Sequence, residues 1–404
     1  MNNPPLARRD MGEKEPAAAV AFGRPDGNPS ACELLKMSSV LAPLRFSLFI
    51  VVTLAGGVSV GLAHRLGARG RWLNFAVRAI ARALLFIMGF HTVGVRDRRS
   101  ETDKARRGGQ RGRAAVRIVV ANHLSLVEVL HLVVVATGDE NWMAPLPQFV
   151  SKASILRMPL FGYVAQKVLK CIAVHRTQND GDPASPAPTS PSAEILAWVD
   201  LHQRRSTDNS SLNVPTLVIF PEGTTSNGTG LLRFRSGAFL PGLPVHPILY
   251  RFSSGTVNAR SFIPTFESIY APFWMWRLLS QPWNTMHVEH CPPIIPTQSE
   301  LKAGAPYTIF RRRARIEIAS ALGLPMYDFG YGDKNAYHDC LRNVFSGKEY
   351  DAAGVLAGSE REDPLADRVR LGVVRACTGL GFVRSLVAML LTPQPFRRTC
   401  EKDE

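Results

Sequence analysis

Apolar residues at the start of the chain form runs much longer than those that follow. Residues 46–63, FSLFIVVTLAGGVSVGLA, contain no charged side chain, and their length is near the lower limit for a helix that crosses a bilayer core of about 30 Å. We interpret them as a membrane anchor. The alternative is a buried helix of a soluble domain, which the Gly56-Gly57 pair disfavours because glycine destabilises a helix interior in water.

The segments around this run are polar or amphipathic. Residues 1–40 are rich in Pro, Ala and charge, which predicts a disordered leader, and their length argues against a cleaved signal peptide. Residues 75–95 are mostly apolar and carry Arg78 and Arg82 at i,i+4 spacing, which suits an interfacial helix or a snorkelling partner. Residues 96–113 contain RDRR, KARR and RGR, a basic connector that attracts anionic lipid headgroups.

From residue 117 onward the apolar runs shorten to strand length. RIVVA at 117–121 predicts a buried strand, and 126–135 predicts the helix that follows it, which together make a β-to-α junction. Further strand patterns lie at 170–175, 215–220, 244–252 and 286–294. Strands that alternate with helical segments indicate an α/β domain over about 105–330.

Two segments decorate or close this domain. Residues 177–213 contain the run GDPASPAPTSPS, which predicts a loop insert on the surface. Residues 306–322 predict a helix that ends before Gly323 and Pro325. This helix carries the basic cluster Arg311, Arg312, Arg313 and Arg315.

The C-terminal extension, residues 346–404, has one further helical pattern. Apolar residues recur over 365–391 with Arg368, Arg375 and Arg384 between them, which predicts an amphipathic helix. Such a helix lies on a membrane surface or packs against the main core, and the pattern leaves both open.

The formal net charge of +15 favours an anionic partner: nucleic acid, an anionic membrane face or a phosphorylated substrate. Nucleic acid is the weakest of these, because the chain lacks an aromatic and basic binding motif. The six cysteines lie far apart, with no CxxC pair and no zinc-site spacing. We interpret them as reduced thiols facing the cytosol, with a disulfide framework as the alternative.

His123 stands where the 117–121 strand gives way to the helix, and Glu128 follows in the run HLSLVE. Strand ends of α/β sheets are common catalytic positions. Acylation of an alcohol requires a base that removes the hydroxyl proton, and a histidine oriented by a carboxylate is suited to this. The pair is therefore a candidate base and orienter. Alternatively, this histidine is merely hydrogen-bonded.

A second candidate site follows the apolar strand TLVIF. In FPEGTTSN, Gly223 permits close approach of a ligand to the backbone. Glu222 can accept hydrogen bonds from a substrate, and Arg233 and Arg235 offer positive charge to phosphates. The alternative is a plain turn followed by an amphipathic strand.

The combination of NHLSLVE, KCIAVHR and VIFPEGTTSNGTGLLRFRSGAFLPGLPVHPILYR resembles the four ordered blocks of the glycerolipid acyltransferase (PlsC-like) family. Within it, the chain is most similar to lysophosphatidylcholine and lysophosphatidylethanolamine acyltransferases. The similarity continues through APLRF, GFHTVGV, WRLLSQPWNTMHVEHCPPIIPTQSE and ALGLPMYDF, over about residues 36–345. It implies an α/β fold with a mixed sheet flanked by helices: an N-terminal membrane anchor and interfacial helix over 41–95 and the acyltransferase domain over 96–345.

The resemblance also implies roles for single residues. His123 is the catalytic base of the first block, and Glu128 orients it. Arg176 closes the second block, where the family holds the phosphate of the acyl acceptor. The third block binds the acceptor, and the fourth is linked to acyl-CoA. The corresponding residues are Glu222, Gly223 and Thr224 in the third block and Pro247 in the fourth.

Three features depart from the family pattern. Its first block usually has Asp in the place of Glu128. Glu is longer by one methylene, and its carboxylate can still reach the imidazole after a small backbone adjustment, so we expect activity to be retained. Catalytic geometry tolerates little error, however, and a displacement of about 1 Å can cost about a hundredfold in rate. His175 replaces an acidic residue or Gln, which bears on headgroup preference. The extended mammalian members of the group carry EF-hand loops after this domain, and no such pattern follows it here, so calcium regulation through such loops is not expected.

These features lead us to expect an acyl-CoA-dependent lysophospholipid acyltransferase at the endoplasmic reticulum membrane, with its catalytic domain in the cytosol. We expect no metal and no cofactor, since acyl-CoA is a substrate, and no nucleic-acid partner. The terminal CEKDE matches neither a KDEL-type nor a dilysine signal, so this location follows from the family and the anchor. The alternatives are acylation of lysophosphatidate or glycerol 3-phosphate, and a non-catalytic membrane-binding homologue.

Overall fold

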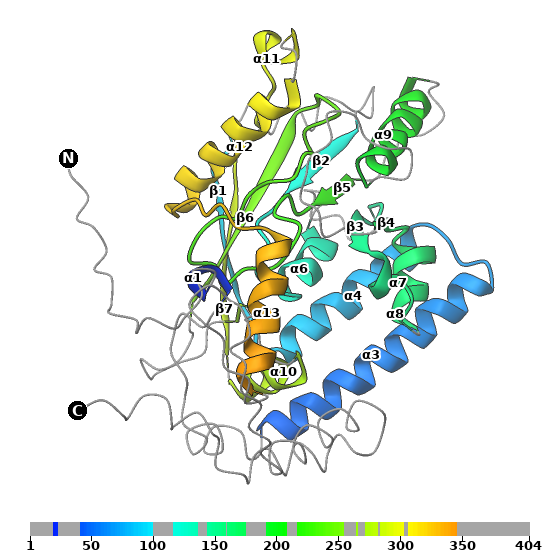
Figure 1. Ribbon diagram of the computed structural model, residues 1–404. Coiled ribbons are helices and arrows are strands. Elements are labelled where there is room, and N and C mark those ends of the chain that lie inside the picture. Colours follow the sequence, from blue (N-terminus) through cyan, green and yellow to red (C-terminus); the bar gives the residue numbers. More distant parts are fainter. Residues whose placement is uncertain are drawn as a thin grey trace, which may run out of the picture.

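The computed structural model describes residues 19–22, 41–99, 116–135, 144–158, 160–174, 191–207, 216–253, 264–265, 271–281, 283–302 and 306–345. A seven-stranded sheet with the order β1-β7-β6-β2-β5-β3-β4 forms its centre (Figure 1). The strands are β1 Val93–Asp97, β2 Arg117–Val120, β3 Gln148–Lys152, β4 Ile172–Val174, β5 Thr216–Ile219, β6 Val245–Ser253 and β7 Thr285–His290.

The sheet is mixed, as expected. β6 and β7 pair antiparallel, and every other neighbouring pair of strands in the sheet is parallel. The sequence pattern located β2, β4, β5, β6 and β7 to within a few residues. It missed β1, which lies in the predicted interfacial helix and basic connector, and it missed β3.

Helices cover both faces of this sheet (Figure 1). The longer ones are α3 Leu41–Arg65, α4 Arg71–Ile87, α6 Val127–Val135, α9 Pro191–Thr207, α10 Ala271–Ser280, α12 Pro306–Leu322 and α13 Tyr331–Phe345. The short ones are α1 Ala19–Phe22, α7 Ala153–Leu156, α8 Phe161–Tyr163, the π-helical turn η2 Val164–Val168 and α11 Gln298–Lys302.

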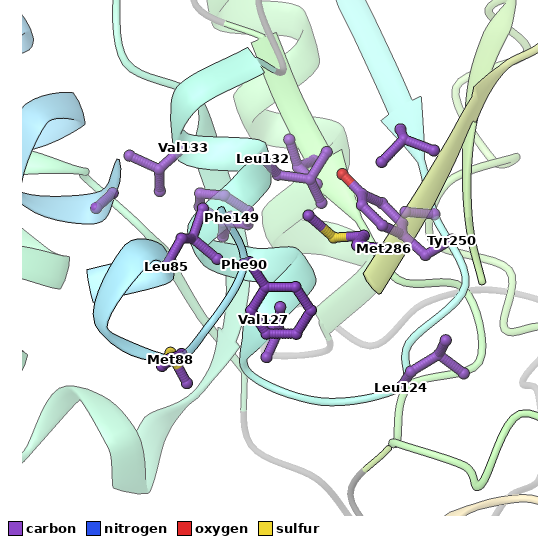
Figure 2. Close-up of a cluster of buried hydrophobic side chains, with 14 of the residues drawn as sticks. Leu85, Met88, Phe90, Leu124, Val127, Leu132, Val133, Phe149, Tyr250 and Met286 are labelled. Carbon is purple, nitrogen blue, oxygen red and sulfur yellow. The ribbon is translucent and has the colours of Figure 1, made fainter. Parts of the chain in front are cut away.

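Alternate residues of the strands build two hydrophobic cores, because successive side chains of a strand point to opposite faces. On one face, Val119 and Val218 pack with α4, α6 and α10. Figure 2 shows this cluster: Leu85 of α4 lies near Phe149 and Val133, and Leu132 of α6 lies near Met286 and Tyr250. On the other face, Ile118 and Leu217 pack with α9 and α12. The result is a helix-sheet-helix sandwich.

The predicted anchor is the greater part of α3. This helix is long and apolar enough to cross a membrane by length and composition. Only three of its residues, Ala42, Val60 and Gly61, are buried, and the others are half-buried or exposed. The arrangement therefore does not match the alternative of a helix buried in a soluble core.

Glycines of α3 are packing positions. A Cβ atom at Gly57 would lie 2.9 Å from Cδ2 of Leu160, and one at Gly56 would lie 3.0 Å from Cδ1 of Ile80 on α4. Leu160 has a φ of 61°, which is unusual for a residue with a side chain. The segment before α8 thus accepts a strained backbone while its leucine contacts the surface that Gly57 leaves open.

Two sequence predictions need correction. Arg78 does not snorkel: its side chain is buried and donates hydrogen bonds to the carbonyl oxygens of Ala144 (2.6 Å) and Pro145 (2.9 Å). The predicted loop insert 177–213 contains helix α9, which packs Trp198 into the second core. The sequence pattern did not reveal this helix, because a proline-rich run leads directly into it.

Other predictions lie outside the described residues. These are the leader apart from α1, residues 100–113 of the basic connector, and the C-terminal extension 346–404 with its amphipathic segment. Where these segments sit stays a prediction.

Candidate active site

The carboxyl end of β2 holds the candidate base. His123 follows this strand, and Glu128 lies in the first turn of α6. Nδ1 of the imidazole is 2.7 Å from Oε1 of Glu128. The structure therefore brings the two predicted residues together despite the longer side chain at position 128.

Local hydrogen bonds explain why the Glu128 side chain adopts this position. Its carboxylate accepts the backbone N–H groups of Leu124 and Ser125, both at 2.7 Å, and the Ser125 hydroxyl at 3.0 Å. Carboxylates are favoured there because N–H groups at a helix start lack partners within the helix. The side chain is fully buried, so the imidazole meets an acceptor that is already held in place.

The His123 ring is fixed on a second side. It stacks on Phe220 with a centroid separation of 4.1 Å and an interplanar angle of 21°. The side chain keeps 19% of its exposure, so the ring remains partly accessible to solvent or substrate. Sequence reasoning missed Phe220 as a contributor, although it directly precedes the PEGTTSN segment.

Glu222 fastens this strand end to the loop after β5. One carboxylate oxygen accepts the backbone N–H of His123 at 2.9 Å, and the other accepts the backbone N–H of Leu232 at 3.0 Å. Burial raises the pKa of this carboxyl to about 7, against the effect of these two hydrogen bonds. The side chain is 1% exposed, which favours positioning of His123 over direct contact with an acceptor.

The neighbouring residues complete the loop. Gly223 has a φ of 67°, and a Cβ atom there would lie 2.8 Å from Nε of Arg235. The Arg235 guanidinium thus lies directly against the turn, which only glycine accommodates. Thr224 is buried, whereas Arg233 is exposed.

The remaining predicted residues divide into two groups. Pro247 is buried in β6, where it pairs with Val120 of β2, so it is on the strand beside the one that His123 follows. Arg176 and His175 lie outside the described residues. The described part of the chain thus brings His123, Glu128, Glu222, Gly223 and Arg235 into one region.

Asn122 also contributes and was not assigned a role from sequence. Its side-chain oxygen accepts the backbone N–H of Tyr250 at 2.8 Å, and its nitrogen donates to the Tyr250 carbonyl at 3.0 Å. These bonds continue the contact between β2 and β6 beyond Pro247, which has no N–H. The signal was its position immediately before the candidate base.

His131 of α6 is not a second base. It is buried, and its Nδ1 lies 3.0 Å from the hydroxyl of Tyr250. Burial, followed by the positive charges of His290 and Arg82, lowers its pKa to about 3. The ring therefore stays neutral and ties α6 to β6. Among the described residues, no group of three or more His, Cys, Asp or Glu side chains is arranged to hold a metal ion.

Comparison with known proteins places this site within a recognised domain. A family model described as Acyltransferase matches residues 105–251. The lysophospholipid acyltransferase LPEAT1 of Arabidopsis thaliana is 28% identical over 297 residues, which cover 70% of this chain and 67% of the relative. The lysophosphatidylcholine acyltransferase of Drosophila melanogaster is 31% identical, over 55% of this chain and 37% of the relative.

One further relative and one solved structure are also similar to this chain. Lysophosphatidylcholine acyltransferase 1 of Danio rerio is 28% identical over 65% of this chain and 43% of the relative. The chain thus spans less than half the length of each of these two animal relatives. The crystal structure of the 1-acyl-sn-glycerophosphate acyltransferase PlsC from Thermotoga maritima is 14% identical with a TM-score of 0.41, and the match covers 71% of this chain and 97% of that one.

Proposed function

We propose, from the Acyltransferase-family domain that residues 105–251 form, that this protein transfers a fatty acyl group from acyl-CoA to the free hydroxyl of a lysophospholipid. The observation that carries the proposal is the 2.7 Å contact between His123 and Glu128 inside that domain. Relatives named for lysophospholipid and lysophosphatidylcholine acyl transfer support the acceptor class.

The contact assigns the two ring nitrogens different tasks. When Nδ1–H donates to the Glu128 carboxylate, Nε2 carries the lone pair and acts as the base. Nε2 takes the proton of the acceptor hydroxyl while the oxygen attacks the thioester carbonyl. The C–S bond then breaks, the imidazolium returns the proton to sulfur, and CoA leaves as a thiol. The buried carboxylate stabilises the imidazolium between these steps.

The backbone of the base is held at both of its polar groups. Glu222 accepts the N–H of His123 at 2.9 Å, and the carbonyl oxygen of His123 accepts the N–H of Ser226 at 3.0 Å. Fixing these groups before the reaction reduces the motion needed to reach an attacking geometry.

Acceptor recognition falls to the arginines near the loop. Arg235 lies against Gly223, and together with Arg233 it supplies positive charge for the acceptor phosphodiester. In this proposal Arg176 holds the same phosphate, Thr224 contributes to the acceptor site, and Pro247 borders the acyl-CoA.

The helix α3 holds the domain at the bilayer, so that the acceptor keeps its tail in lipid while its hydroxyl enters the site. Residues 41–96 contain no Asp or Glu, and Arg65, Arg69 and Arg71 cluster where α3 gives way to α4. Such a carboxylate-free, basic surface suits an anionic membrane face. We place this face on the cytosolic side of the endoplasmic reticulum.

An acceptor panel tests the proposal. Protein-containing membranes or detergent-purified protein are assayed with one acyl-CoA against lysophosphatidylcholine, lysophosphatidylethanolamine, lysophosphatidate and glycerol 3-phosphate. We expect transfer to the first two to be fastest. A marked preference for a phosphate monoester would reassign the acceptor, and transfer to none of the four would favour a non-catalytic membrane-binding homologue.

A further inference from the structure

A buried lysine from outside the matched domain contacts the loop beside the candidate base. Lys334, in the first turn of α13, is 5% exposed. Its ammonium group donates to the backbone oxygen of Thr225 at 2.7 Å and to the Thr225 hydroxyl at 2.5 Å. The domain match ends at residue 251, so this contact comes from a later part of the chain.

Thr225 is one residue away from a direct contact with the base. The backbone N–H of Ser226 donates to the carbonyl oxygen of His123 at 3.0 Å. Because the Thr225 carbonyl belongs to the same peptide unit as the Ser226 N–H, the lysine and His123 grip the two sides of one planar peptide. The lysine is thus joined to the backbone of the base through this one peptide.

The loop over residues 223–228 has a glycine at each end, so contacts with other segments are needed to fix its backbone. Gly223 and Gly228 have φ values of 67° and 80°, and glycine is the residue with the most backbone freedom. Thr225 lies between them. A hydrogen bond to its carbonyl restrains the segment between the two glycines.

Lys334 is itself held in place. The Asp333 carboxylate accepts the backbone N–H of Gly330 at 2.7 Å at the start of α13. The ammonium group also lies 5.6 Å from the ring centroid of Phe22 in α1. In addition, the N–H of Asn227 donates to the carbonyl oxygen of Ala21 at 3.0 Å. One segment that precedes the matched domain in the sequence, α1, and one that follows it, α13, thus both contact the loop.

We propose that Lys334 is a positioning residue for acyl transfer: by fixing the Thr225–Ser226 peptide, it holds the backbone of His123 in its reactive place. The inference rests on the proposed function for its activity readout. It assigns no contact between Lys334 and either substrate.

The test compares Lys334→Met with Lys334→Arg, Thr225→Val and the control Lys302→Met, which removes an exposed lysine of α11. We expect Lys334→Met to lower kcat by about tenfold to a hundredfold, since small displacements at a reacting centre have effects of this size. The KM values for both substrates should change less than about threefold, because the substitution removes no contact with a bound substrate. Arg, which keeps a cationic donor, should restore part of kcat.

Two further measurements separate positioning from general damage. Thr225→Val removes only the hydroxyl acceptor, so it should lower kcat less than Lys334→Met, and the double variant should resemble Lys334→Met alone. Peptide mass spectrometry after diethylpyrocarbonate treatment gives the labelling rate of His123 relative to the exposed His287. This ratio should change in Lys334→Met and stay constant in Lys302→Met, with all assays run below each variant's Tm.

The outcomes that would overturn the inference differ from those that would overturn the function. An active parent protein whose kcat and His123 labelling ratio are unchanged by Lys334→Met contradicts the positioning role alone. A large rise in KM at constant kcat would instead make Lys334 a substrate ligand. A parent protein without acyl transfer contradicts the proposed function, and the labelling ratio still tests whether Lys334 controls the environment of His123.

Discussion

The carboxylate of Glu222 accepts the backbone N–H of His123 at 2.9 Å and, through its other oxygen, the backbone N–H of Leu232 at 3.0 Å. One buried side chain thus joins the end of β2 to the segment that follows the β5 loop. Because the ionised form is desolvated there, this joint makes the stability of the protein depend on pH.

We predict that Glu222 makes the folded protein less stable as the pH rises through the mildly acidic range. Its folded-state pKa of about 7 lies above the ordinary value of 4.5, so the folded protein binds the extra proton between these two values. The free energy of unfolding that this group contributes is greatest below about pH 4.5 and falls until about pH 7. Glu222→Gln removes the titration.

The measurement is Tm against pH for the parent and Glu222→Gln. The difference, parent minus variant, should decrease from about pH 4.5 to about pH 7 and then become constant. A difference that rises over the same range would mean that Glu222 is stabilised in its ionised form, contrary to the burial seen here.

Glu128→Gln should keep the fold but remove most of the activity. Gln can still accept some of the N–H groups of Leu124 and Ser125, whereas it carries no charge to stabilise an imidazolium at Nδ1. We expect kcat to fall by about a hundredfold or more. Circular dichroism and Tm serve as controls, and unchanged kcat would exclude an electrostatic role for the carboxylate.

Glu128→Asp tests whether this chain has adapted to the longer acid. Asp is shorter by one methylene and cannot keep both the 2.7 Å contact to His123 and the hydrogen bonds at the helix start without a backbone shift. We expect about a tenfold fall in kcat. A higher kcat in Glu128→Asp would show that Glu128 is not the better acid for catalysis at this position.

Gly223→Ala should impair catalysis through the loop. The added Cβ would lie 2.8 Å from Nε of Arg235 and would occupy a φ of 67°, so the turn and the guanidinium must both move. Steady-state kinetics should show a lower kcat/KM for the lysophospholipid, with a smaller change in KM for acyl-CoA. An equal effect on both substrates would argue against an acceptor-specific loop.

The contact between Gly57 of α3 and Leu160, just before α8, provides a stability prediction that is independent of the reaction. Gly57→Val places methyl groups where Cδ2 of Leu160 already lies 2.9 Å from the Cβ position. Overpacking of this kind typically costs about 1–3 kcal/mol. Thermal unfolding in detergent should show a lower Tm, and Leu160→Ala should recover part of the loss in the double variant. Additive losses would contradict the direct contact.

Much of the sheet could be predicted because its central strands are short, continuous apolar runs, as expected for parallel strands that are covered on both faces. Ile118, Val119 and Val120 illustrate this, since all three are buried and alternate between the two cores. β1 escaped prediction because it is an edge strand whose residues are mostly exposed. Arg78 was misread because sequence pattern cannot reveal that the carbonyl groups of Ala144 and Pro145 lie within its reach.

In the candidate site too, contacts between residues close in sequence could be predicted and contacts between distant residues could not. The His123 and Glu128 pair is local, so spacing was enough to propose it. The hydrogen bonds of Glu222 join residues 99 and 10 positions apart, and Lys334 reaches Thr225 across 109 positions. No local signal specifies such contacts, because they depend on how the loop after β5 folds back toward α13.

The most direct test of His123 as the base is acyl transfer from acyl-CoA to lysophosphatidylcholine by the parent protein and by His123→Ala, each reconstituted in the same lipid and matched for Tm. We predict turnover by the parent and a loss of about a hundredfold or more in the variant. Equal turnover by both proteins would contradict the assignment of His123 as the base.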